Sequence, residues 1–274
     1  MLSRLEKIIG KDNINILKNK SVLVLGCGGV GGYVVESLAR SGIGTLILVD
    51  FDKIDKSNIN RQIIALNSTI GRLKVDVLEE RIKDINKDIK VIKISEFIDN
   101  NNIDILFDNK IDYFVDACDT MVTKKSVIKE CINKKINFIS SMGTGNKLDP
   151  SKLEICRIED TINDPIARIM RKFVKDEKIK SKVMVLSSKE VPIKTGDSTP
   201  GSSAFVPSSA GLLIASYIVR EFIKKEWLSH SFYYSPFTKS SASNSWLNTS
   251  LSIVSFTISN NSEFKSNFSV PSKV

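Results

Sequence analysis

The chain has 274 residues, and 42% of them are hydrophobic, which is enough for a sizeable core in one large domain or one domain with an appendage. Lys and Arg outnumber Asp and Glu by 40 to 31, and the resulting formal charge of +9 favours anionic partners such as nucleic acid without establishing one. The four cysteines show no C-x-x-C spacing and there is a single histidine, which argues against a zinc ribbon, a paired redox motif and a histidine base.

Strands and helices alternate in the first half of the chain. An amphipathic helix is expected over 2–18, and a buried strand over 21–25 then leads into a glycine-rich corner and another helix. Further strands are predicted at 45–50, 90–94, 112–116 and 136–140, with helices at 74–85 and 121–133. Such alternation implies parallel pairing through right-handed crossovers. We therefore expect an α/β fold: a doubly wound, mostly parallel Rossmann-like sheet with helices on both faces.

The pattern changes after Pro150. The stretches "KLEICRIED" and "KVMVLSSKE" predict two more strands, and the basic stretch 168–182 lies between them. A segment rich in Gly, Ser and Pro then leads into an apolar helix near 211–223. From 229 onward the chain is rich in serine and has no clear periodicity. We expect a nucleotide-binding domain over 1–228 and a poorly ordered tail over 229–274.

The ends of the chain bear on its location. The first ten residues, "MLSRLEKIIG", lack a signal-peptide core, and the longest late apolar run, 211–219, is too short to span a bilayer. We therefore expect a reduced, cytoplasmic compartment and no membrane partner.

The glycine-rich corner "GCGGVGG" fits G-x-G-x-x-G through Gly26, Gly28 and Gly31, with Gly29 in the gap. Such glycines permit a tight turn, a close approach of backbone to phosphate, and packing of the following helix. Asp50 ends the next strand, where a carboxylate can accept hydrogen bonds from ribose hydroxyls. An adenine nucleotide is the predicted ligand, and both NAD and ATP satisfy these features.

Residues beyond the corner favour ATP over NAD. Polar side chains follow the second predicted strand and end the fourth, so they should meet at the carboxyl edge of the sheet: Asp52, Asn58, Arg61, Gln62, Lys74, Asp116 and Asp119. Cationic side chains neutralise phosphate oxygens and a carboxylate can hold Mg²⁺. Taken singly, Arg61 or Lys74 is explained by a solvated charge and Asp119 by a helix N-cap. Together, they predict a site for a triphosphate with Mg²⁺.

The order of these motifs resembles a known superfamily. G-C-G-G-V-G, D-F-D, S-N-I-N-R-Q, G-x-x-K and D-A-C-D occur in the order typical of the ubiquitin-activating-enzyme-like adenylyltransferases, over roughly 1–225. Within that superfamily, "LARSGIG", "NRQIIAL", "MGTGNKLDP", "DTINDP" and "FVPSSAGLL" resemble the tRNA threonylcarbamoyladenosine dehydratase branch. That resemblance implies an ATP-dependent cyclisation of the threonylcarbamoyl group on the tRNA adenosine beside the anticodon, through an acyl-adenylate.

The resemblance also implies roles by position. Arg61, Lys74 and Asp119 would be the catalytic group, with Mg²⁺ on Asp119. The wider nucleotide site would comprise Gly26, Gly28, Gly29, Gly31, Asp50, Asp52, Asn58, Arg61, Gln62 and Lys74. Arg4 would reach the ATP of the other subunit in a homodimer, although an exposed helix charge explains it equally well. A monovalent cation and a sulfur-relay partner protein are further expectations.

Three other functions share parts of this sequence pattern. Activation of a sulfur-carrier or ubiquitin-like protein would usually require paired cysteines and a reactive thiol, for which Cys156 is the one loop-side candidate. An NAD-dependent dehydrogenase would need a hydride-transfer partner such as histidine, and none is evident. A non-enzymatic subunit would be expected to lose Arg61, Lys74 or Asp119, and all three are present.

The basic stretch 168–182 is a candidate clamp for the tRNA backbone. It carries seven cationic residues against Asp176 and Glu177: Arg168, Arg171, Lys172, Lys175, Lys178, Lys180 and Lys182. Phosphate contacts of this kind give affinity that depends on salt and tolerates sequence changes. A solvated helix face is the simpler explanation of the same pattern.

Overall fold

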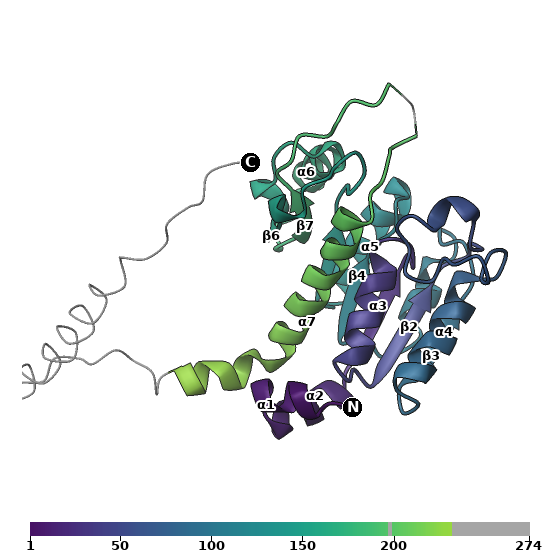
Figure 1. Cartoon of the computed structure of the whole chain (residues 1–274). Coiled ribbons are helices and arrows are strands. Elements are labelled where there is room, and N and C mark those ends of the chain that lie inside the picture. Colours follow the sequence, from purple (N-terminus) through teal and green to yellow (C-terminus); the bar gives the residue numbers. More distant parts are fainter. Residues whose placement is uncertain (197–198, 232–274) are drawn as a thin grey trace, which may run out of the picture. The chain divides into compact units, whose positions relative to one another are not determined.

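A seven-stranded sheet runs through the protein (Figure 1), and the computed structural model describes residues 1–196 and 199–231. The strand order is β3-β2-β1-β4-β5-β7-β6, and only β6 runs antiparallel to its neighbour. The strands are β1 (Ser21–Leu25), β2 (Thr45–Val49), β3 (Lys90–Ile94), β4 (Tyr113–Asp116), β5 (Phe138–Ser141), β6 (Leu153–Arg157) and β7 (Met184–Ser188). The chain order reverses between β1 and β4, and this arrangement opens a crevice at the carboxyl ends of those strands.

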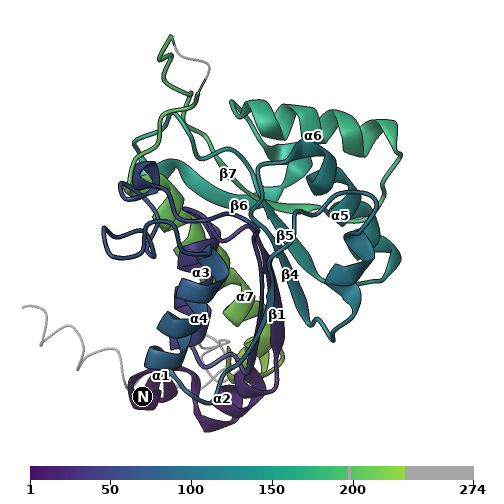
Figure 2. The same cartoon turned by 90° about the vertical axis from the view of Figure 1, so that its right-hand side faces the viewer.

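Helices cover both faces of the sheet, as Figure 2 shows nearly edge-on. One face carries α3 (Gly31–Arg40), α4 (Lys74–Ile85) and α7 (Phe205–Ser231), and the other carries α5 (Met121–Asn133) and α6 (Pro165–Asp176). Short 3-10 helices occur at Lys56–Asn58, Ile103–Phe107, Pro150–Lys152 and Ile158–Asp160. The predicted doubly wound, mostly parallel α/β sheet is confirmed.

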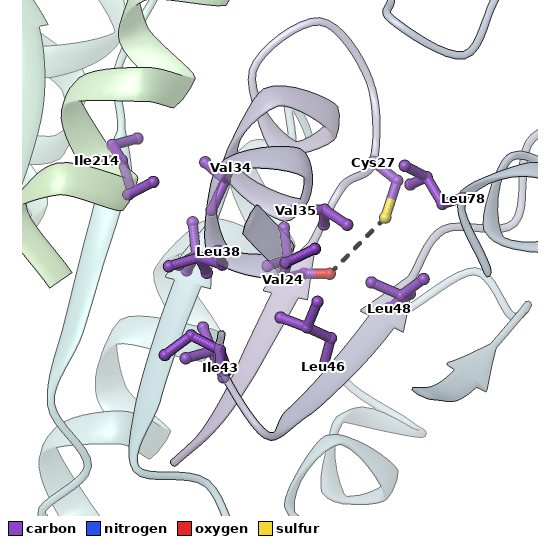
Figure 3. Packing of buried hydrophobic residues seen from close by; sticks show 14 of the residues in the cluster. Val24, Cys27, Val34, Val35, Leu38, Ile43, Leu46, Leu48, Leu78 and Ile214 are labelled. Atoms are coloured by element: carbon purple, nitrogen blue, oxygen red, sulfur yellow. Dashed lines mark hydrogen bonds between the residues drawn. The ribbon is translucent and has the colours of Figure 1, made fainter. Parts of the chain in front are cut away.

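The core explains why these segments fold as they do. Every residue of β1 is buried, as expected for a central parallel strand covered on both faces. The face of α3 formed by Val34, Val35 and Leu38 packs on this sheet, where Val24 and Leu48 lie beneath it (Figure 3). A second cluster fills the opposite face under α5 and α6. The buried apolar side chains of α3 therefore lie on the one face that meets the sheet.

Element boundaries match the sequence predictions closely, with one error at the N-terminus. The strand 90–94 and the helices 74–85 and 121–133 have the bounds that the pattern predicted. The single helix expected over 2–18 is wrong, because the chain forms α1 (Ser3–Ile9) and α2 (Lys11–Lys18) instead. Gly10 separates them with a φ of 82°, a left-handed conformation that ends a helix.

Helix α7 is longer than the apolar run that predicted it. It packs closely on α3 at Gly211, where a Cβ atom would lie 2.5 Å from the Val30 carbonyl oxygen. By length and composition its part Phe205–Ile223 could cross a membrane, but half of that stretch is buried inside the protein. The core helix of a soluble protein has the same properties, and the expectation of no membrane partner stays a prediction.

One compact unit covers Met1–Trp227. The predicted serine-rich tail, 229–274, lies outside the described residues beyond Ser231. Its order and the boundary at 228 therefore stay predictions.

Candidate active site

A cavity of about 510 Å³ opens at the carboxyl ends of β1, β2 and β4. Its size is typical of a ligand pocket, and its position is the one where open parallel sheets bind ligands. The structure brings most of the predicted site residues to its walls: Gly26, Gly28, Gly29, Asp50, Asp52, Asn58, Arg61, Gln62, Lys74 and Asp119. These residues come from segments up to about 90 positions apart in the sequence, so the fold assembles the site.

The glycine corner forms the floor of this cavity. Gly26 has a φ of 86°, and a Cβ atom there would lie 2.7 Å from the Ala117 carbonyl oxygen, so only glycine fits. Within the described chain, the N–H groups of Gly28, Gly29 and Val30 have no hydrogen-bond acceptor. These N–H groups and the start of α3 form a ready-made site for phosphate oxygens.

Two carboxylates and one ammonium group line the β2 side. Asp50 is almost buried, and its two oxygens accept hydrogen bonds from the Cys27 N–H at 2.7 Å and the Asp52 N–H at 2.9 Å. The Lys74 Nζ, at the first residue of α4, lies 2.6 Å from Asp52 Oδ2 and 3.5 Å from Asp50 Oδ2. The ammonium group has a third N–H to offer a ligand. Two carboxylates and one cation leave this wall with a net negative charge that suits ribose hydroxyls.

Arg61 is the cation that faces the glycine floor. Its Nη1 donates to the Ser57 carbonyl and to Asn60 Oδ1, and no carboxylate pairs with it among the described ion pairs. Its Cγ lies 3.5 Å from where a Gly29 Cβ would be. An arginine without an acidic partner, beside free backbone N–H groups, suits an anionic group such as a phosphate.

Gln62 supplies an unsatisfied polar atom at the same place. It is 8% exposed, and its amide nitrogen lies 3.6 Å from the position of a Gly28 Cβ. Its Oε1 is buried without a hydrogen-bond partner. A buried unpaired acceptor is costly, so this atom indicates that a ligand or ordered water completes the site.

The loop after β4 forms the third wall, and Asp119 is exposed there. No cluster of three or more His, Cys, Asp or Glu side chains that could hold a metal exists in the described chain. Mg²⁺ is commonly bound by one or two carboxylates together with substrate phosphates and water. Asp119 beside a phosphate site fits that donor set, whereas an all-protein metal cage does not exist in the described chain.

Two aromatic rings at the mouth were not predicted from the sequence. Phe51 and Phe97 are each 49% exposed, line the cavity, and meet edge to face with centroids 5.0 Å apart. Exposed aromatic rings beside the Asp50 carboxylate suit an adenine ring. The position of Phe51 between Asp50 and Asp52 was the available signal, but nothing in the sequence shows that Phe97 joins it.

Lys124 is a further residue whose role was not predicted from the sequence. It lies on α5 and is fully buried, and its Nζ contacts Asp116 Oδ2 at 2.8 Å, Ser140 Oγ at 3.2 Å and the Ser141 carbonyl at 3.1 Å. Asp116 also accepts hydrogen bonds from Ser140 Oγ and the Cys118 N–H. This closed network joins the ends of β4 and β5 beneath the loop that carries Asp119.

A buried ion pair fixes the opposite rim. Lys147 Nζ lies 2.6 Å from Asp164 Oδ2 and 2.6 Å from the Gly143 carbonyl oxygen, and Asp164 also caps α6 through the Ala167 N–H. These bonds tie the loop 143–147, whose Thr144 lines the cavity, to the start of α6. The loop 143–147 and the start of α6 are therefore held together at this rim of the cavity.

Three predicted residues do not line the cavity, and one of them, Asp116, is fully buried in the network with Lys124. Gly31 lies beneath the cavity, where a Cβ would collide with the Gly26 carbonyl oxygen, so its part is in packing α3 on the sheet. Arg4 is exposed on α1, and α1 and α2 lie near the amino ends of the strands (Figure 1). Arg4 therefore cannot act at the cavity of its own chain.

The cysteines have the environment of structural thiols. All four are free. Burial raises the pKa of the Cys118 thiol, which also lies beside the Asp116 carboxylate, and burial raises the pKa of Cys156 to about 11. Both thiols are therefore protonated near neutral pH, and a protonated thiol is a poor nucleophile.

The whole described domain is similar to one known protein family. The model of the ThiF family matches residues 2–226. The tRNA threonylcarbamoyladenosine dehydratase of Bacillus subtilis (strain 168) is 42% identical over 239 residues, which cover 81% of this chain and 94% of that protein.

Two solved structures that resemble this fold come from the same class of enzyme. The crystal structure of Escherichia coli tRNA N6-threonylcarbamoyladenosine dehydratase in complex with ATP has a TM-score of 0.78 and 28% identity, covering 83% of this chain and 95% of that chain. The same enzyme in complex with AMP has a TM-score of 0.76 and 28% identity, covering 81% and 94%.

Proposed function

Because this chain belongs to the ThiF family, we propose that it is a tRNA threonylcarbamoyladenosine dehydratase, an enzyme that uses ATP to cyclise the threonylcarbamoyl group on the adenosine beside the anticodon. The observation that carries the proposal is the cavity itself. It joins unpaired backbone N–H groups, Arg61 and Asp50 in one place, which suits phosphates and a ribose.

The chemistry begins with a carboxylate, which resists attack until it is activated. The threonyl carboxylate attacks the α-phosphate of ATP, pyrophosphate leaves, and the acyl group is held as an adenylate. The backbone amides of Gly28 and Gly29 and the guanidinium of Arg61 stabilise the negative charge that builds on the phosphates. Lys74 remains anchored by Asp50 and Asp52, and its third N–H adds to that stabilisation.

Ring closure follows within the substrate. The carbamoyl group attacks the activated carbonyl, a new bond closes the ring, and AMP leaves with the former carboxylate oxygen. The net change is the loss of the elements of one water from the tRNA. Because both reacting groups belong to one side chain, proximity replaces an enzyme nucleophile. That explains why a site without histidine or an ionised thiol is sufficient.

The proposal also includes a bound Mg²⁺ ion and association of two copies of the chain as a homodimer. Asp119 would hold the metal, which would neutralise charge on the phosphates when bound. Arg4 lies away from the cavity of its own chain, so a role at ATP requires a second copy. Exposed apolar side chains on α7, at Phe205, Leu212 and Leu213, support such an association. A cytoplasmic location is proposed because the substrate is tRNA.

Activation of a carrier protein is the alternative, and the thiol environment disfavours it. The monovalent cation and the sulfur-relay partner stay predictions, since no described contact bears on them.

The test is to incubate the protein with ATP, Mg²⁺ and one of three substrates: unmodified tRNA, threonylcarbamoylated tRNA, or a carrier protein with a free C-terminus. Pyrophosphate should be released only with threonylcarbamoylated tRNA. Release with the carrier protein alone would replace the proposal with its alternative.

Cys118→Ser and Cys156→Ser should each keep most of the wild-type turnover, because cyclisation needs no enzyme thiolate. The measurement is the steady-state rate of pyrophosphate release with threonylcarbamoylated tRNA. A thioester trapped on the wild-type enzyme but absent from either variant would show instead that the cysteine carries the acyl group.

A further inference from the structure

The helices α5 and α6 form a basic surface beside the active site. They pack together on one face of the sheet, and the ammonium groups of Lys125 and Lys129 lie 5.8 and 5.6 Å from the centroid of the Phe173 ring. We name this the α5–α6 surface and define it by these two lysines and three cations of α6: Arg168, Lys172 and Lys175. Lys129 also pairs with Glu177 at 2.8 Å.

The three α6 cations share one face of that helix. They occupy positions i, i+4 and i+7, opposite the buried residues Ala167 and Met170. All three are exposed, and none of them takes part in an ion pair within the described chain. Three exposed charges of one sign without acidic partners repel each other, and an anionic partner would relieve that repulsion.

One predicted clamp residue has a different role. Arg171 is partly buried, and its Nη1 donates to the Thr161 carbonyl oxygen at 2.7 Å and to Thr161 Oγ1. The bonds fix the chain just before α6. Arg171 is therefore left out of the α5–α6 surface, because its Nη1 is already bonded inside the protein; its contact with phosphate stays a prediction.

Helices α5 and α6 both begin close to the cavity. Thr123, in the first turn of α5, lines the cavity, and so does Thr144. Gly143, beside Thr144, bonds to Asp164, the N-cap of α6. Both helices therefore start at the rim where the target nucleotide must enter. A nucleic acid strand with one base in the cavity would continue over these helices.

We infer that the α5–α6 surface binds the sugar–phosphate backbone of the tRNA next to the modified nucleotide. The inference rests on the proposed function for the identity of the nucleic acid. Backbone contacts carry no sequence information directly, so this surface contributes affinity and orientation while the cavity recognises the modified base. It also adds α5 to the clamp that the sequence placed on the stretch 168–182 alone.

The experiment compares two charge-matched double variants. Arg168→Glu/Lys172→Glu alters the α5–α6 surface, and Lys87→Glu/Lys90→Glu makes the same charge change at the opposite edge of the sheet, where both lysines are exposed. Binding of threonylcarbamoylated tRNA is measured across a salt series, with ATP affinity and the unfolding midpoint as controls. All four substituted side chains are exposed, so both variants should stay folded.

The surface variant should bind tRNA more weakly than the control variant. Its slope of log K against log salt should flatten by about 0.7–0.9 for each lost contact, and its ATP affinity should not change. Its KM for tRNA should rise, whereas kcat at saturating tRNA should stay close to the wild-type value.

Equal tRNA affinity and slope in the wild type and the surface variant would overturn the inference. Equal weakening in both variants would also overturn it, because the effect would then be one of net charge. These results are separate from a failure of the proposed function, in which wild-type protein would release no pyrophosphate with threonylcarbamoylated tRNA.

Discussion

Replacing Asp119 with alanine should lower the rate of pyrophosphate release by about a hundred- to a thousandfold, the usual effect of removing one charge-stabilising group from an active site. Asp119 is exposed and takes part in no described hydrogen bond or ion pair, so the variant should fold normally. The rate is measured with threonylcarbamoylated tRNA, and Asp119→Asn should be similarly impaired because an amide is a weaker ligand for Mg²⁺.

A second measurement tests whether Asp119 acts through Mg²⁺. Calorimetry should show that Mg²⁺ strengthens ATP binding to the wild type more than to Asp119→Ala. Asp108→Ala, an exposed carboxylate after the 3-10 helix 103–107, is the matched control. Wild-type kinetics in a well-folded Asp119→Ala protein would remove this residue from the mechanism.

Lys74→Ala should also lower turnover, but it is a less specific test of the chemistry than Asp119→Ala. Lys74 lines the cavity, in agreement with its predicted place at the carboxyl edge of the sheet. In the structure its side chain is nearly buried between Asp50 and Asp52. Removing the Lys74 ammonium group therefore leaves the buried Asp50 carboxylate without its cation, so the free energy of unfolding falls as well.

Lys124→Met should destabilise the protein by about 3–5 kcal/mol, because it removes one partner of a fully buried ion pair and leaves Asp116 uncompensated. The measurement is the midpoint of urea unfolding at neutral pH. Lys134→Met is the control, since Lys134 lies at the end of the same helix in an exposed pair with Glu130, and such pairs contribute little. An unchanged midpoint for Lys124→Met would contradict the account of this network.

The double variant Lys124→Met/Asp116→Asn tests whether the unpaired Asp116 charge causes the loss of stability. Removing both charges should restore part of the lost stability, because no buried carboxylate is then left without a cation. Turnover should stay below the wild-type rate, since the Asp116 hydrogen bonds also hold the loop that leads to Asp119.

Local patterns predicted the elements of this fold well. A buried parallel strand appears in the sequence as a short apolar run. In the amphipathic helices 74–85 and 121–133 the apolar residues recur with the period of a helix. Strands and helices of these kinds can therefore be recognised without knowledge of tertiary contacts. The split of the first helix was missed because the left-handed conformation of Gly10 is invisible in the hydrophobic pattern. The motif order also identified the residues that the structure brings to one cavity.

Long-range pairs could not be predicted in the same way. Lys124 looks like any polar residue of a helix, and only the fold brings it to Asp116 and Ser140. Similarly, the Lys147–Asp164 pair joins two loops, and the bond from Arg171 Nη1 to the Thr161 carbonyl oxygen depends on how the chain folds before α6. Pairings of this kind depend on the packing of elements, which a single sequence does not specify.

The most direct test of the central claim is the mass of the modified nucleoside after the reaction. Threonylcarbamoylated tRNA is incubated with the protein, ATP and Mg²⁺, then digested gently to nucleosides and analysed by mass spectrometry. The threonylcarbamoyl nucleoside should lose the mass of one water, only when ATP is present and with formation of AMP. An unchanged nucleoside, together with ATP-dependent adenylation of a carrier protein, would contradict the proposed function.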